Sequence, residues 1–150
     1  MRSRLPRVST VARYVLGLIF FVFGLNGFLH FIPQPPPEGA AATFMGGLAA
    51  TGYFFPLLKG TEVVAGALLL SNRLVPLALT VLAPIVVNIV AFHVALAPAA
   101  LPMAILVLVL EIGLAWAYRD VFAPILRSQA APASAPARAR LTDRSHAPVA

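Results

Sequence analysis

A cation and an anion three residues apart, Lys59 and Glu62, interrupt a stretch that is otherwise apolar enough to cross a membrane. As an α-helix, the stretch 51–71 would measure about 30 Å, which matches the hydrocarbon thickness of a bilayer. Its larger apolar side chains favour insertion by roughly 0.3 to 0.6 kcal/mol each, whereas each charge near the centre costs roughly 2.5 to 3.5 kcal/mol. These contributions nearly cancel, so we expect the polar face of this helix to turn towards other helices or a watery cavity.

Three interpretations of this pair are open at the level of sequence. The two side chains can neutralise each other and help a helix bundle to pack, since residues three apart share a helix face. They can instead belong to a functional pocket inside the membrane. In the third interpretation, the expected membrane boundary of this span is misplaced.

The composition places the chain among membrane proteins. It is 60% hydrophobic and 11% charged, with a mean hydropathy of +0.90, which is too apolar for an ordinary soluble domain. The net charge of +6 comes mostly from arginines near the chain ends and beside apolar stretches, without a basic helix or an interleaved aromatic motif, so membrane topology explains the charge better than nucleic-acid binding does. The absence of cysteine excludes disulfides, cysteine-ligated metals and dithiol chemistry carried by this chain.

Four apolar stretches predict an all-α membrane protein, a four-transmembrane-helix antiparallel bundle. The expected transmembrane domain covers 12–127, with spans at about 12–32, 51–71, 74–96 and 101–119. The weakly hydrophobic segment 40–50 predicts a short interfacial helix between the first two spans, and an alternative register makes 40–58 the second span.

The chain ends are expected to flank this domain on one side. We expect 1–11 to be a basic N-terminus that is retained, because the apolar run after it is too long for a signal peptide. Residues 128–150, rich in Ala, Pro, Ser and Arg, are expected to form a disordered tail. The arginines lie before the first span, between the second and third, and after the fourth. This distribution predicts that both termini are cytoplasmic.

Polar side chains occur at compatible depths in all four spans, which predicts an intramembrane ligand pocket that opens to the outer face. Its candidate residues are Asn26, His30, Lys59, Glu62, Asn88, His93 and Glu111. Asn88 and His93 point about 140° apart on a helix and need not both face inward. A single membrane histidine is more often a hydrogen-bonded interface residue than a ligand. Glu111 has no opposite charge in its own helix, so it is either protonated or paired with Lys59 across the bundle.

No motif predicts catalysis or a metal site. The sequence has no glycine-rich phosphate loop and no serine or cysteine nucleophile beside a base. The membrane histidines and glutamates also lack the close spacing of metal sites in helix bundles. We therefore assign neither catalytic residues nor metal ligands.

Three segments carry a resemblance to a known family: FGLNGFLHFIP, GYFFPLLKGTEVVAGALLL and PLALTVLAPIVVNIVAFH. Over about 14–120 the chain resembles the DoxX family of small bacterial membrane proteins. The resemblance implies a four-helix bundle in the bacterial cytoplasmic (inner) membrane. The family takes its name from a subunit of a thiosulfate:quinone oxidoreductase, so it implies an accessory or ligand-binding subunit of a quinone-linked redox system. Quinone would then be the ligand and a redox protein the partner. Related folds use cysteines for thiol chemistry, and this chain has none. The resemblance therefore does not imply an electron-relay role for it.

Two other functions are consistent with the sequence. Glu62 and Glu111 at mid-depth would suit a small proton-coupled permease. A purely structural scaffold for another membrane protein is the third hypothesis, since small residues let helices approach closely. The glycines expected at such close contacts are Gly17, Gly24, Gly66 and Gly113.

Overall fold

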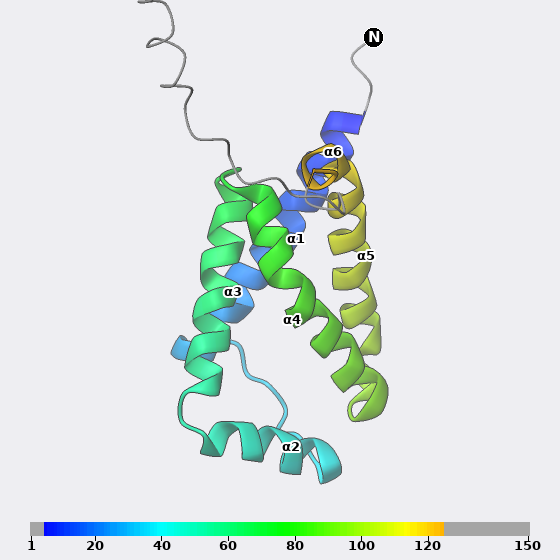
Figure 1. Cartoon of the computed structure of the whole chain (residues 1–150). Helices are drawn as coiled ribbons and strands as arrows, with labels where there is room; N and C mark the ends of the chain where they lie inside the picture. The colour runs from blue at the N-terminus through cyan, green and yellow to red at the C-terminus, as the bar shows by residue number, and fades with distance from the viewer. Residues whose placement is uncertain (1–4, 125–150) are drawn as a thin grey trace, which may run out of the picture.

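The computed structural model describes residues 5–124, and all regular secondary structure in this range is helical. Figure 1 shows the elements, which are α1 (Leu5–Leu29), α2 (Gly39–Ala50), α3 (Phe54–Leu70), α4 (Val75–Ala95), the 3₁₀-helix η1 (Pro98–Ala100), α5 (Leu101–Ala117) and α6 (Arg119–Phe122). The prediction of an all-α protein is confirmed. The predicted tail at 128–150 lies outside the described residues.

Three segments are helical, long and apolar enough to cross a membrane: Arg7–Leu29, Val75–Ala95 and Pro98–Ala117. Helices α2 and α3 meet the same criteria only together, and they are bent by 91° where they join. The number of candidate spans is therefore three, or four if the bent pair counts as one. Helix α3 alone has 17 residues, about 25 Å of rise, which is shorter than the hydrocarbon thickness of about 30 Å.

The first helix differs from its prediction at both ends. It begins at Leu5 instead of residue 12, so much of the expected basic N-terminus is already helical. A helix that crosses a membrane can continue into the polar region, where arginines are solvated. It ends at Leu29 instead of residue 32, because His30 adopts a left-handed backbone with φ 52°.

The segment 40–50 forms a helix of its own, as predicted, and the break after Ala50 means that no continuous helix covers 40–58. The chain turns between Ala50 and Phe54, where Gly52 has a φ of 73° that favours glycine. Thr51 stabilises this turn, since its hydroxyl donates to the Leu48 carbonyl at 2.6 Å and accepts from the Phe54 N–H at 3.2 Å.

Four helices pack around a shared apolar core. Helix α1 contacts α3 and α5, and α4 contacts the same two helices, with the most extensive contact between α1 and α3. The largest fully buried side chains come from all four helices: Leu16, Leu69, Leu79, Leu82, Val86 and Leu114. In Figure 1 the start of α1, the turn from α3 to α4 and α6 lie at one end of the molecule, and α2 lies across the other.

Candidate functional site

Lys59 and Glu62 form an ion pair within α3. Lys59 Nζ donates to Glu62 Oε2 at 2.8 Å, as their spacing of three residues predicts. The Glu62 side chain is only 5% exposed, whereas that of Lys59 is 25% exposed. The pair therefore joins a buried anion to a cation that reaches the protein surface.

The pair lies where glycines bring α1 and α3 close together. A Cβ atom added at Gly24 would lie 3.1 Å from Glu62 Cβ and 2.9 Å from the backbone nitrogen of Val63. A Cβ at Gly27 would overlap the aliphatic part of Lys59. The side chains of the ion pair thus occupy space that α1 leaves free by having no side chains there.

Further along the same contact the two backbones nearly touch. A Cβ at Gly66 would lie 2.6 Å from the backbone nitrogen of Phe21 and 2.8 Å from the carbonyl oxygen of Gly17. Gly17, Gly24 and Gly66 are thus close-packing positions, as predicted, but their contacts are within this chain. A Cβ at Gly113 would meet no atom within 4 Å, so this glycine is not needed for packing in the described chain.

Asn26 is buried near the contact between α1 and α3, and its side chain forms hydrogen bonds with the backbone that follows α1. Its amide nitrogen donates to the Ile32 carbonyl at 3.2 Å, and its oxygen accepts from the Ile32 N–H at 2.6 Å. His30, which follows the end of α1, is exposed. The end of α1 therefore separates Asn26 from His30.

The two predicted residues of α4 bond to carbonyls of their own helix. Asn88 is exposed and donates to the Pro84 carbonyl at 2.9 Å. His93 Nδ1 lies 2.7 Å from the Ile89 carbonyl oxygen, and its ring packs edge-on against Phe92. Helical periodicity explains the position of Asn88, because the buried face of α4 runs through Leu79, Leu82 and Val86.

Glu111 is buried in α5 with 6% exposure, and its Oε2 atom has no hydrogen-bond partner among the described residues. Lys59 bonds to Glu62, so the alternative in which Lys59 pairs with Glu111 is not observed. The structure thus brings Lys59 and Glu62 together beside α1 and places Glu111 separately in the core. Within residues 5–124, no three His, Asp or Glu side chains are arranged to hold a metal ion.

Arg13 has a structural role that sequence reasoning missed. It is 5% exposed, and its Nη1 donates to the carbonyl oxygens of Leu69 and Leu70 in the last turn of α3. A cation at this position adds a charged donor at the end of α3, where the Leu69 carbonyl also accepts from the Asn72 N–H, and it interacts favourably with the helix dipole. The spacing of Arg13, Leu16 and Phe20 places them on one helix face, which could have indicated that Arg13 faces inward.

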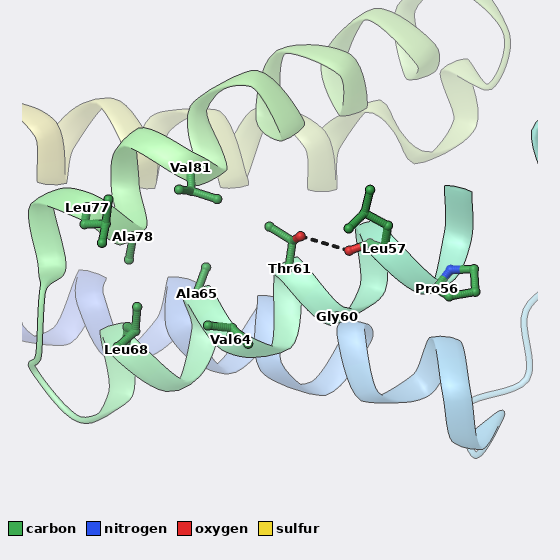
Figure 2. A pocket seen from close by; sticks show the side chains of 10 residues that line it. All are labelled: Pro56, Leu57, Gly60, Thr61, Val64, Ala65, Leu68, Leu77, Ala78 and Val81. Atoms are coloured by element: carbon green, nitrogen blue, oxygen red, sulfur yellow. Dashed lines mark hydrogen bonds between the residues drawn. The ribbon is translucent and has the colours of Figure 1, made fainter. Parts of the chain in front are cut away.

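An apolar groove of about 450 Å³ lies between α3 and α4 (Figure 2). The single hydroxyl in its lining belongs to Thr61, which donates to the Leu57 carbonyl at 2.8 Å. None of the seven predicted pocket residues lines it. Its lining residues are Pro56, Leu57, Gly60, Thr61, Val64, Ala65, Leu68, Leu77, Ala78 and Val81.

No family model, curated protein or solved structure matches this chain. The resemblance to the DoxX family therefore stays a prediction.

Proposed function

We propose that this chain is a multi-pass protein of the bacterial cytoplasmic membrane, of the DoxX type, in which α1, α3, α4 and α5 form an antiparallel four-helix bundle. Both termini would be cytoplasmic. The position of the charges supports this proposal. Arg7, Arg73 and Arg119 belong to the end of the molecule that holds the start of α1, the turn after α3 and α6, whereas Glu38 is the sole charged residue between Ile32 and Tyr53.

In this membrane the protein would act as a non-catalytic accessory subunit of a quinone-linked redox system, with a quinone-like ligand bound beside Lys59 and Glu62. The observation that carries this proposal is the partial exposure of Lys59. An ammonium group has three N–H donors, and one of them bonds to Glu62. The others can donate to a carbonyl oxygen of a neutral ring, which leaves the charge balance of the ion pair unchanged.

Residues at the end of α1 provide suitable surroundings for such a ring. Phe28 and His30 follow Gly27, which Lys59 contacts, and both are exposed. Aromatic faces of this kind can stack on a flat ligand in offset or edge-on arrangements.

Quinone content of the purified protein tests this proposal. The full chain is extracted from bacterial membranes, and quinones are quantified per chain by mass spectrometry. We expect Lys59→Met to lose most of the bound quinone and His30→Ala to lose part of it. Asn88→Leu is the control, since Asn88 is exposed and bonds within α4. Wild-type quinone content in both Lys59→Met and His30→Ala would rule out this binding site.

A proton-coupled permease is the second candidate, and the buried Glu111 Oε2 atom, which has no hydrogen-bond partner within residues 5–124, favours it. A buried ionisable side chain in a membrane helix often belongs to a proton pathway. In proteoliposomes with an imposed pH gradient, uptake from a panel of labelled organic solutes would then be lost in Glu111→Gln and Glu62→Gln. Uptake by the wild type at the rate of empty vesicles would reject the permease.

A further inference from the structure

The groove between α3 and α4 is long and narrow at one end, and its lining is apolar except for the hydroxyl of Thr61. Its lining on α3 extends from Pro56 to Leu68, which corresponds to about 18 Å of helix. Half of the hydrocarbon thickness of a bilayer is about 15 Å, so the groove has the length of one leaflet. Figure 2 shows α3 and α4 diverging from the turn that joins them, with Leu68 and Leu77 at the narrow end and Pro56 at the wide end.

A cation lies in the turn that closes the narrow end. Arg73 is exposed and belongs to the connection between Leu70 and Val75, close in sequence to both Leu68 and Leu77. Its side chain makes no hydrogen bond or ion pair within the part of the chain that the structure describes. An exposed arginine at the end of an apolar groove combines the two features that bind a phospholipid, an apolar surface for the acyl chain and a cation for the phosphate group.

We propose that this groove binds one acyl chain of an anionic phospholipid whose phosphate group is held by Arg73. The acyl chain lies along α3 and α4 from Leu68 towards Pro56. The lipid belongs to the leaflet at the end of the molecule that carries Arg73. This inference does not depend on the quinone proposal, because the groove and the Lys59–Glu62 pair involve different residues of α3.

The lining chemistry selects a saturated or unsaturated hydrocarbon chain over a polar ligand. The hydroxyl of Thr61 is already bonded to the backbone, so the groove offers no free side-chain donor along its length. The charge of Arg73 selects a phospholipid over an isoprenoid quinone, whose head group is neutral. An anionic head group also gains from the positive charge of this end, where one basic residue near the surface contributes about a fivefold preference.

Native mass spectrometry of the full chain in detergent tests the site. The probes are phosphatidylglycerol and phosphatidylcholine with identical palmitoyl and oleoyl chains. We expect one phosphatidylglycerol per chain, retained at about fivefold lower lipid concentration than phosphatidylcholine. Gly60→Leu should abolish tight binding of both lipids, because a side chain at Gly60 would extend into the groove without meeting protein atoms within 4 Å of its Cβ. Arg73→Gln should keep binding but remove the preference for phosphatidylglycerol.

Two matched controls are available. Gly113→Leu adds the same side chain at a glycine with equally open space on α5, and Arg119→Gln removes a charge from the same end of the molecule outside the groove. Both should behave as the wild type. If Gly60→Leu does not give soluble protein, Gly60→Ala replaces it and should weaken binding less.

Three results would overturn the proposal. Undiminished phosphatidylglycerol binding in the Gly60 variant would place the lipid elsewhere. If Arg73→Gln keeps the preference for phosphatidylglycerol over phosphatidylcholine, Arg73 does not hold the head group. An isoprenoid lipid that co-purifies with the wild type and is lost in Gly60→Leu would assign the groove to a neutral ligand.

Discussion

Helix α3 meets α1 and α4 in opposite ways. Towards α1 it presents Gly66 and the Lys59–Glu62 pair, and the backbones come so close that no Cβ fits at Gly66. Towards α4 it presents apolar side chains along a groove, and Gly60 has open space around it. Two glycines six residues apart on one helix thus have different roles. The side facing α1 is held by close packing, and the side facing α4 leaves space for a ligand.

The largest expected effect on stability comes from a side chain added where α1 and α3 pack closely. Gly66→Ala should lower the free energy of unfolding by about 3 kcal/mol, because backbone atoms of Phe21 and Gly17 occupy the space of the new Cβ. Gly60→Ala should be neutral or stabilise by up to about 1 kcal/mol, since alanine favours helix more than glycine does. Thermal unfolding in detergent measures both. Equal melting temperatures for the two variants would contradict the close packing of α1 and α3.

Removal of the cation from the ion pair is expected to have the next largest effect. Lys59→Met leaves the buried Glu62 carboxyl group without its partner, which should cost about 3 kcal/mol. The double variant Lys59→Met/Glu62→Leu removes both charges and should recover most of this loss. Unfolding by denaturing detergent gives the comparison. A double variant no more stable than Lys59→Met would show that the loss has another origin than the stranded carboxyl group.

The buried arginine at the other end of this helix pair is expected to contribute less. Arg13→Met removes the bonds to the Leu69 and Leu70 carbonyls and should cost about 2 kcal/mol, as for hydrogen bonds to a charged group. The control is Arg7→Met, because Arg7 is exposed on the same helix. Faster hydrogen exchange at the end of α3 in the Arg13 variant alone would support the capping role, and identical exchange in both variants would exclude it.

Among the variants where α1 meets α3, a change at Asn26 should have the smallest measurable effect on the free energy of unfolding. Asn26→Ala removes two bonds to the backbone of Ile32 and should cost about 1 kcal/mol. The matched variant Asn88→Ala removes an exposed bond within α4 and should change stability by less than about 0.5 kcal/mol. Amide exchange of Ile32 reports the first change directly. Unaltered protection of that amide would contradict the hydrogen bond between the Ile32 N–H and Asn26.

Much of the candidate site was predictable where local spacing decides the contact. The pairing of Lys59 with Glu62 follows from their separation of three on one helix, and glycines were expected at close helix contacts. The positions of His30 and Asn88 were not predictable in the same way. The helix end at Leu29 and the burial of the opposite face of α4 depend on the whole structure.

The sequence by itself determined that the chain is helical and apolar enough for a membrane, because hydrophobicity and the length of apolar stretches act locally, whereas the break between α2 and α3 came from the structure. Only the tertiary structure decided which side of α3 faces α1 and which borders the groove, and that Arg13 caps a helix 56 residues away. Such choices depend on how side chains from distant segments share space, and a helical repeat specifies a face without specifying its neighbour.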